Sequence, residues 1–182
     1  MGKSKSDVSC GFYPGASNPS GASMTTRIGI GYDIHPMKDN QPLWLGGILI
    51  PFEKGLVGHS DADALLHAVI DALLGAAALG DIGHYFPSSD PKFKGIASKS
   101  MLATVMSEIK RAGYKIGNVD TVVVAQIPKI APHRDKIRET MAGLLGIRVE
   151  DVQVKAKTNE GLDAIGQGDA IAAHAVVLLE KS

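Results

Sequence analysis

The chain has 182 residues, a length typical of one domain, and its 45% apolar and 21% charged residues are typical of a globular protein. Nineteen basic residues balance nineteen acidic ones, so the basic excess of a protein that wraps nucleic acid is missing. The single cysteine excludes an internal disulfide and a zinc site built from cysteines, and no apolar run approaches the roughly 20 residues of a membrane span. We therefore expect neither nucleic acid nor a membrane as a partner.

The first 23 residues differ in composition from the rest of the chain. They are rich in Ser, Gly and Pro and show no apolar periodicity, which predicts a disordered leader at 1–23 and a single folded domain at 24–182. Met24 resembles a second start, so we interpret the leader as derived from an expression vector, with a native extension as the alternative. It lacks the apolar core of a signal peptide, and we expect a cytoplasmic location, with a plastid as the alternative.

Patterns of apolar residues predict alternating strands and helices. Alternation at 27–35 is typical of a half-buried strand that Pro36 ends, and Ser60 or Asp61 is a candidate N-cap for the first helix. In chain order, we predict strands at 27–35 and 43–50, a helix at 64–78, a loop at 80–95, a helix around 102–109, a strand at 119–126, a helix around 137–145, a strand at 152–157, a glycine-rich loop at 159–168 and a strand at 171–179.

These elements predict an α/β (α+β) sandwich, in which a mixed sheet of four or five strands carries helices on one face. The chain has 21 glycines and only nine aromatic residues, so it has few large side chains with which to cover the second face of the sheet. Oligomerisation is the usual way to bury such a face, and we therefore expect an oligomer.

Three residues form a candidate metal site. Asp33 and His35 are two positions apart on a predicted strand, so both leave the same face. The predicted helix at 64–78 carries His67, and two imidazoles with one carboxylate make a zinc site that leaves a fourth position open for substrate. The alternative for the strand pair is a hydrogen-bonded Asp–His pair without a metal.

The same helix carries a polar stripe, because Asp63, His67 and Asp71 recur every four residues among Ala, Leu, Val and Ile. A solvent-facing stripe normally includes Lys or Glu, and residues 59–78 contain neither. We therefore expect the stripe to be partly buried, with Asp63 and Asp71 orienting the imidazole of His67.

Two further segments favour phosphate binding. His59 and Ser60 precede a helix, where free backbone N–H groups form a phosphate cradle, although an ordinary Ser cap beside an exposed His is the alternative. Lys155 and Lys157 share a strand face that suits an anion, with two exposed lysines as the alternative. Glu160 follows them and is a candidate ligand for magnesium against phosphate oxygens.

Five motifs follow one another along the chain: Gly-Tyr-Asp-Ile-His at 31–35, His-Ser-Asp-Ala-Asp at 59–63 followed by His67, the segment 71–83, Ala-Gln-Ile-Pro-Lys at 125–129 and Lys-Ala-Lys-Thr-Asn-Glu at 155–160. Each is weak alone, but together and in this order they resemble the 2-C-methyl-D-erythritol 2,4-cyclodiphosphate synthase family of the non-mevalonate isoprenoid pathway. The resemblance extends over residues 26–180.

The resemblance implies a homotrimer of α/β subunits with active sites between neighbours, zinc on Asp33, His35 and His67, and magnesium or manganese on Glu160. The implied enzyme is a phosphorus–oxygen lyase that converts 4-diphosphocytidyl-2-C-methyl-D-erythritol 2-phosphate to the 2,4-cyclodiphosphate and releases CMP. In this reaction the 2-phosphate of the substrate attacks the β-phosphate, while His59 and Thr158 match residues that stabilise the transition state.

The resemblance also assigns substrate contacts. It implies that 125–131 read the cytosine, that Asp81 accepts the ribose hydroxyls, and that 86–90 close over the methylerythritol part. On the sequence alone, Asp81 is an ordinary turn or helix-terminus residue. The full set of implied substrate-binding residues is Ser60, Asp81, Ile82, Gly83, Phe86, Pro87, Ser88, Ser89, Asp90, Ala125, Gln126, Ile127, Pro128, Lys129, Ile130, Ala131, Lys157, Asn159, Ala164 and Gln167.

The sequence departs from the family pattern in three places. Ala164 replaces a common aromatic residue, Gln167 replaces a common Arg, and Ser88 replaces a common acidic residue. Loss of the Arg removes a bidentate partner for a diphosphate in the central cavity of a trimer. Two other functions fit the same residues: a metal-dependent phosphodiesterase that uses activated water, and a non-catalytic trimeric ligand-binding protein with a structural metal.

Overall fold

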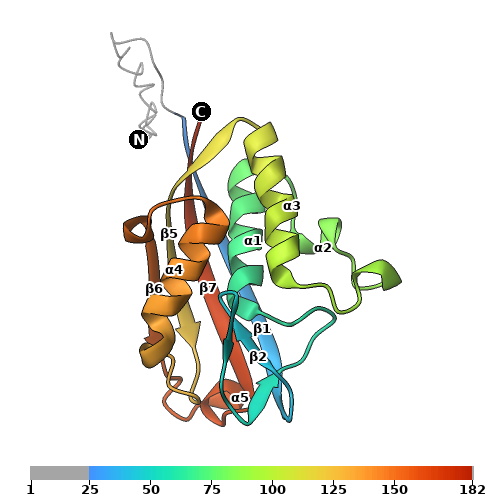
Figure 1. Ribbon diagram of the computed structural model, residues 1–182, viewed down its shortest axis with the longest axis vertical. Helices are drawn as coiled ribbons and strands as arrows, with labels where there is room; N and C mark the ends of the chain where they lie inside the picture. The colour runs from blue at the N-terminus through green and yellow to red at the C-terminus, as the bar shows by residue number, and fades with distance from the viewer. Residues whose placement is uncertain (1–24, 182) are drawn as a thin grey trace, which may run out of the picture.

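The structure is a computed structural model that describes residues 25–181, so the predicted leader at 1–23 lies outside the described residues. Its main sheet has five strands in the order β4-β1-β7-β5-β6, in which only β5 and β6 are parallel (Figure 1). These strands are β1 (Thr26–Asp39), β4 (Lys54–Leu56), β5 (Tyr114–Val124), β6 (Val152–Lys157) and β7 (Ala170–Lys181), and a separate hairpin contains β2 (Leu43–Leu45) and β3 (Ile48–Ile50).

The three long helices lie on one face of this sheet (Figure 1). They are α1 (Ala64–Ala77), α3 (Ser98–Arg111) and α4 (Arg134–Leu145), and the short helical segments are α2 (Ile82–Tyr85), η1 (Pro91–Phe93), η2 (Ala131–His133), η3 (Val149–Asp151) and α5 (Asp163–Gly166). The predicted mixed sheet with helices on one face is therefore confirmed.

Helix α1 packs on β1 more closely than ordinary side chains allow. A Cβ atom on Gly29 or Gly31 would lie 1.9 Å from the carbonyl oxygen of Ala72 or Ala68, respectively. Glycine on the strand and alanine on the helix thus bring the two backbones together, and all but two residues of α1 are buried. Because α1 runs opposite to β1 here, the contact places Asp33, which follows Gly31, beside His67, which precedes Ala68.

Several boundaries differ from the sequence predictions. Pro36 does not end β1, because a proline lacks only the N–H donor; its carbonyl still accepts a bond from the Val57 N–H at 3.0 Å. Strand β5 begins at Tyr114 rather than 119, since a register shift between Ile116 and Asn118 interrupts its alternation. The loops predicted at 80–95 and 159–168 contain α2, η1 and α5.

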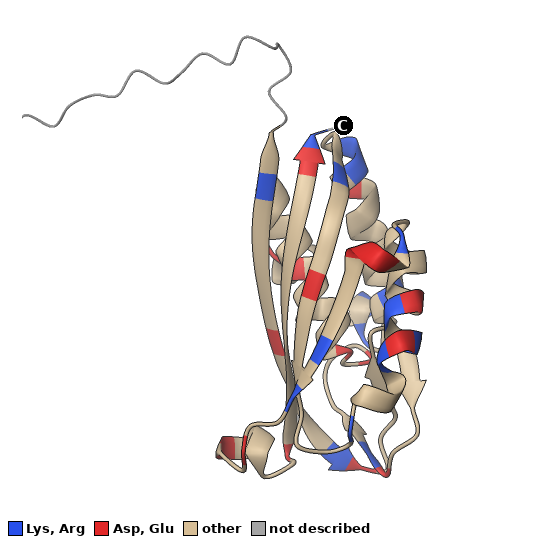
Figure 2. Ribbon diagram, turned by 90° about the vertical axis from the view of Figure 1, so that its left-hand side faces the viewer, with Lys and Arg blue, Asp and Glu red and all other residues tan. Residues whose placement is uncertain are grey.

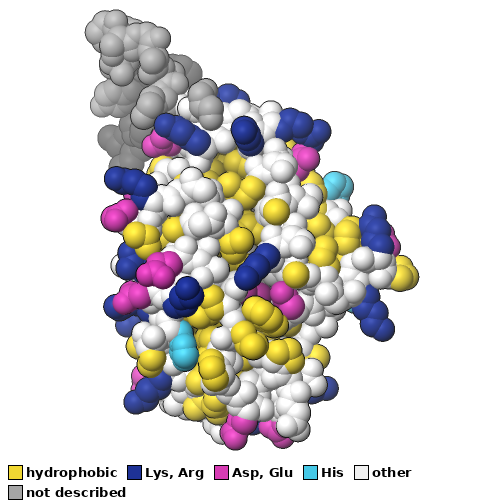
Figure 3. Space-filling model, viewed as in Figure 1, with side chains coloured by type: hydrophobic (Ala, Val, Ile, Leu, Met, Phe, Trp, Pro, Cys, Tyr) yellow, Lys and Arg dark blue, Asp and Glu magenta, His cyan; other side chains and the backbone are white. Residues whose placement is uncertain are grey.

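The two faces of the molecule differ in character. Over the helices, basic and acidic side chains are interspersed (Figure 3). The opposite face of the sheet carries few charged residues along its strands (Figure 2), and its exposed residues include Ile28, Ile30, Tyr32 and Val176, at 71%, 73%, 50% and 43% exposure. Among residues 25–181, no helix is long and apolar enough to cross a bilayer.

Candidate functional site

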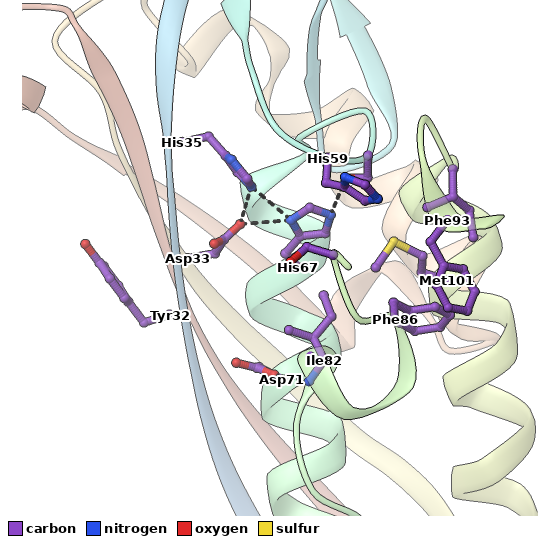
Figure 4. A pocket seen from close by; sticks show the side chains of 14 residues that line it. Tyr32, Asp33, His35, His59, His67, Asp71, Ile82, Phe86, Phe93 and Met101 are labelled. Atoms are coloured by element: carbon purple, nitrogen blue, oxygen red, sulfur yellow. Dashed lines mark hydrogen bonds and ion pairs between the residues drawn. The ribbon is translucent and has the colours of Figure 1, made fainter. Parts of the chain in front are cut away.

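A cavity of about 240 Å³ opens between β1, α1, α2 and the start of α3 (Figure 4). Ten of the residues that the sequence analysis singled out line it, and nine of these belong to the predicted site set, the exception being Asp71. The ten are Asp33, His35, His59, Ser60, His67, Asp71, Ile82, Gly83, Phe86 and Ser88. The remaining lining residues are Tyr32, Phe93, Ile96 and Met101. The cavity therefore combines polar groups from β1 and α1 with an apolar wall from 86–101.

Asp33, His35 and His67 meet at the floor of the cavity (Figure 4). Asp33 Oδ2 is 2.9 Å from both His35 Nε2 and His67 Nδ1, and the two nitrogens are 3.1 Å apart. Ligand atoms of a tetrahedral zinc ion are separated by about 3.3 Å, given Zn–N and Zn–O distances of about 2.0–2.1 Å. The predicted strand–helix convergence is confirmed.

The chemistry of these atoms suits a cation. His35 Nδ1 lies 3.2 Å from the carbonyl oxygen of Val57, which can only accept, so Nδ1 carries the proton and Nε2 presents its lone pair to the centre. Asp33 contributes a carboxylate oxygen to the same point. Side chains of this kind, with one open side toward the cavity, form a three-ligand metal site.

Charge within the triad perturbs both acid–base groups. Burial opposes ionisation of Asp33, but without a metal the hydrogen bonds and positive charge of the cationic forms of His35 and His67 outweigh burial and hold the pKa of Asp33 well below its usual range. Burial likewise opposes the charged form of His35, yet the hydrogen bond and the charge of Asp33 raise the pKa of His35 overall. Even without a metal, the surroundings therefore favour an ionised Asp33 and the charged form of His35.

The residues that orient His67 differ from the prediction. Asp63 is the N-cap of α1, where its carboxylate accepts from Leu66 N and reaches Gly46 N and Gly47 N at 2.8 and 2.6 Å. Asp71 accepts from Ile82 N at 2.8 Å. The prediction that Asp63 and Asp71 orient His67 is thus wrong, because backbone N–H groups of other segments bind both carboxylates. The candidate N-caps Ser60 and Asp61 are also wrong, since Asp63 caps α1.

The Nε2 atom of His67 instead faces two hydroxyl groups. Ser98 Oγ lies 2.8 Å from it and Ser60 Oγ 3.1 Å. Sequence reasoning missed Ser98 completely, along with the apolar wall of Phe93, Ile96 and Met101. No local pattern marks these residues, although Ser98 does stand at the start of a helix.

His59 and Ser60 line the cavity, and part of the expected cradle of free N–H groups is already engaged within the chain. The N–H of Asp61 donates to Ile96 O at 3.2 Å, and that of Ala62 donates to Ser60 Oγ at 3.1 Å. The N–H of Leu66 already donates to the Asp63 carboxylate. These three N–H groups are therefore not available to a phosphate at this end of the cavity.

Some of the predicted site residues at 81–90 line the cavity, and others only stabilise the short helices beside it. Ile82, Gly83, Phe86 and Ser88 line the cavity, whereas Pro87, Ser89, Asp81 and Asp90 do not. Asp81 is the N-cap of α2 through His84 N at 2.9 Å, which is the helix-terminus role that the sequence alone allowed. Asp90 has the equivalent position in η1, through Lys92 N.

The second set of predicted residues lies elsewhere on the chain. None of them lines the cavity of His67: Ala125, Gln126, Ile127, Pro128, Lys129, Ile130 and Ala131 follow β5, and Lys157, Thr158, Asn159, Glu160, Ala164 and Gln167 follow β6. Because β1 and β6 lie toward opposite edges of the sheet, the two sets are on opposite sides of one chain (Figure 1).

Contacts within this second set are local. Thr158 Oγ1 donates to Glu160 Oε1 at 2.7 Å, and Gln167 Nε2 donates to Gly161 O at 2.9 Å. Asn159 bonds to Asp163 and Leu162. Thr158, Glu160 and Gln167 are exposed, so their polar groups remain accessible.

The expected anion beside the two lysines is partly supplied by the chain itself. Lys155 Nζ lies 2.6 Å from Asp120 Oδ2 on the neighbouring strand β5. Both lysines line a pocket with Ala131 and Arg134. Lys155 is therefore paired with a carboxylate of its own chain, whereas Lys157 has no ion pair among residues 25–181.

Comparison with known proteins assigns the chain to a family. The YgbB family model matches residues 26–180. A relative from Trichlorobacter lovleyi named 2-C-methyl-D-erythritol 2,4-cyclodiphosphate synthase is 54% identical over 84% of this chain and 98% of its own length. A protein of the same name from Burkholderia vietnamiensis is 54% identical over 87% of this chain and all of its own.

A solved structure of a 2C-methyl-D-erythritol-2,4-cyclodiphosphate synthase in its CDP-bound form is also similar. It is 39% identical, with a TM-score of 0.78, over 84% of this chain and 99% of that one. These matches extend over the whole described fold, including β1, α1 and the loops after β5 and β6. The chain belongs to the YgbB family, whose matched members are 2-C-methyl-D-erythritol 2,4-cyclodiphosphate synthases.

Proposed function

We propose that this protein converts 4-diphosphocytidyl-2-C-methyl-D-erythritol 2-phosphate to 2-C-methyl-D-erythritol 2,4-cyclodiphosphate and releases CMP, as a phosphorus–oxygen lyase. The observation that carries this proposal is the Asp33–His35–His67 triad, which is open to a cavity in a chain of this family. The 2-phosphate of the substrate is already a nucleophile, so the protein needs no base to create one. Its task is to hold two anionic groups together.

Two divalent cations fit the donor sets of this chain. Zinc held by Asp33, His35 and His67 would supply Lewis acidity at the β-phosphate, and magnesium or manganese held by Glu160 would neutralise charge on the α- and β-phosphates. Glu160 is exposed, and among residues 25–181 its carboxylate has only Thr158 as a hydrogen-bond partner, which leaves oxygen atoms free for a cation.

Protein side chains would position the reacting groups. We assign His59 and Thr158 as donors to the phosphate oxygens in the transition state, because both are accessible and each lies beside a proposed metal ligand. Ser60 donates at the same phosphates. The apolar wall that includes Phe86 and Phe93, whose rings meet edge to face with centroids 5.4 Å apart, excludes water from the methylerythritol part.

The nucleotide would bind to segments that follow β5 and α1. We assign 125–131 to the cytosine and Asp81 with Gly83 to the ribose. A cytidine nucleotide as ligand is supported by the similar structure solved in its CDP-bound form. Pro87, Ser88, Ser89 and Asp90 complete the loop beside the substrate. Lys157 and Asn159 are the remaining phosphate contacts, while Ala164 and Gln167 make a weaker anion site than the aromatic residue and Arg that are common at these positions.

We further propose that the active unit is a homotrimer with its sites between chains. The two halves of the predicted site lie on opposite edges of one sheet, so they meet only when the β1 edge of one copy adjoins the β6 edge of the next. A heterologous contact of this kind closes into a ring when the rotation between neighbours closes, as it does with the threefold symmetry of a trimer. The exposed Ile28, Ile30 and Val176 would then be covered.

The reaction is tested by incubating the zinc- and magnesium-loaded protein with the cytidine substrate and following products by ³¹P NMR. Cyclic diphosphate and CMP in equal amounts are the expected products. Linear phosphates would instead identify a phosphodiesterase that uses water, and an unchanged substrate would indicate a binding protein with a structural metal. His67→Ala leaves the zinc site with only two of its three protein ligands, and it should therefore abolish turnover.

A further inference from the structure

A continuous hydrogen-bond chain runs from the metal triad to the first turn of α3. His67 directs Nδ1 toward Asp33 and Nε2 toward Ser98 Oγ, at 2.9 and 2.8 Å, respectively. Ser98 is completely buried, and its hydroxyl donates to Asp61 Oδ1. The second carboxylate oxygen of Asp61 accepts from the Ser98 N–H at 3.0 Å.

The charge of Asp61 fixes the direction of this chain. An ionised carboxylate only accepts, so the one hydroxyl proton of Ser98 points to Asp61, and Ser98 Oγ is left as an acceptor for His67. The proton of the neutral His67 ring must then be on Nε2, and the lone pair of Nδ1 faces Asp33 and His35. A weaker chain would leave more of the other tautomer, in which Nδ1–H donates to Asp33 and blocks the metal.

From this chain we propose that Ser98 and Asp61 are positioning residues for the metal centre, which hold His67 in the tautomer that binds a divalent cation through Nδ1. The proposal rests on the proposed zinc site but not on the reaction that follows. Ser60 Oγ lies 3.1 Å from the same nitrogen and shares the acceptor role more weakly, because it already accepts from Ala62 N.

The same contacts tie the cavity wall to the metal site. Asp61 binds both the N–H and the hydroxyl of Ser98, and its own N–H donates to Ile96 O. Gly95 N in turn donates to His59 O at 2.8 Å. The segment 95–98 is therefore anchored to 59–61, directly behind His67.

The sharpest test is Asp61→Asn. The amide oxygen of the variant still accepts from Ser98 N, so the start of α3 is preserved. The amide N–H groups donate to Ser98 Oγ, which then donates to His67 Nε2 and places the ring proton on Nδ1. We expect zinc affinity, measured by competition with a chromophoric chelator, to fall on the order of 10–100-fold.

Ser98 is tested in parallel. Ser98→Ala removes the main acceptor, and we expect a loss of about tenfold because Ser60 remains, whereas Ser98→Thr retains the hydroxyl and restores most of the affinity. In the zinc-bound wild type, the Nε2–H proton of His67 should give a slowly exchanging NMR signal. Ser98→Ala should make that proton exchange faster.

Matched controls separate positioning from folding. Ser107→Ala changes a serine on α3 whose hydroxyl donates to Ala103 O within its own helix, and Asp135→Asn changes an acidic residue in the first turn of α4. Both should bind zinc as the wild type does. Wild-type zinc affinity in Asp61→Asn and Ser98→Ala, or equal losses in the controls, would overturn the proposal. Zinc binding without cyclisation would overturn the reaction alone.

Discussion

The two edges of the sheet hold their polar side chains in different ways. At the β1 edge, Asp33, His35 and His67 are partly or fully buried and held by the contact of Gly31 with the backbone of α1. At the β6 edge, Thr158 and Glu160 are exposed and bonded to each other. Packing within one chain fixes the side chains of the first edge. The side chains of the second edge are accessible to a ligand or to another chain.

The largest expected effect is a loss of stability when the close packing of β1 against α1 is disrupted. Gly31→Ala places a Cβ atom 1.9 Å from Ala68 O, and we expect a loss of about 3 kcal/mol or more in the free energy of unfolding, together with loss of zinc binding. Urea denaturation measures the first and chelator competition the second.

The control for that substitution lies in the same layer of the fold. Gly75 on α1 has open space around its missing side chain, so Gly75→Ala should raise the free energy of unfolding by up to about 1 kcal/mol through helix propensity. Wild-type stability in Gly31→Ala would contradict the close-packing explanation.

The metal site separates the two edges functionally. His35→Ala should lower zinc affinity more than about 100-fold, a larger effect than that of an outer hydrogen-bond partner. Thr158→Ala should leave zinc affinity unchanged, because Thr158 follows β6, but lower turnover on the order of 100-fold or more by removing a phosphate donor. Chelator competition and ³¹P kinetics give the two numbers. A weaker zinc affinity in Thr158→Ala would contradict the assignment of zinc binding to the β1 edge alone.

Mixing two inactive variants tests whether the edges of different chains meet. His67→Gln disables the first edge and Glu160→Gln the second, so each homo-oligomer should be inactive. When the two variants are refolded together at equal amounts, about a quarter of the interfaces pair two intact edges, and activity should return to about that fraction. Absence of recovery in a confirmed mixed oligomer would place both edges in one chain's site.

A substitution on the exposed face of the sheet tests whether the protein forms an oligomer through that face. Ile30→Asp adds a charge at a position that is 73% exposed in one chain, so the monomer should fold and bind zinc normally. Sedimentation should show loss of the oligomer, because an unpaired charge is costly in a buried interface. Lys110→Asp on α3, which lies on the helix face away from this surface, is the matched control and should assemble normally.

The smallest effect concerns Asp71. Burial raises the pKa of its carboxyl, and the charges of Asp81 and Asp33 add to this against the hydrogen bond from Ile82 N. The folded state therefore holds the proton more tightly than the unfolded state, and stability falls as pH rises from about 4 through the folded pKa.

Asp71→Asn should remove that loss. The variant keeps an acceptor for Ile82 N, and its advantage over the wild type should grow from pH 4 upward but remain below about 1 kcal/mol, since Asp71 is half-exposed. Thermal denaturation across this pH range measures the difference. A variant that is less stable than the wild type at neutral pH would contradict the sign.

Local periodicity accounts for the parts of the site that could be predicted. Two-residue alternation puts Asp33 and His35 on one strand face, and the apolar stripe of α3 marks its buried side. Ser98 and Met101 escaped prediction because their role depends on where α3 begins relative to His67, which no repeat in the sequence encodes. The N-cap was misassigned for a similar reason, since Gly46 and Gly47 from a distant hairpin bind Asp63.

The sequence by itself determined which side chains share a strand face or a helix turn, because backbone periodicity is local and holds wherever the element lies. It also determined the family, through motifs read in order. Only the tertiary structure decided which atoms meet: His67 Nδ1 with Asp33, and His67 Nε2 with Ser98. Those contacts depend on how closely α1 approaches β1 and on where α3 starts, and both are set by packing between segments that are distant along the chain.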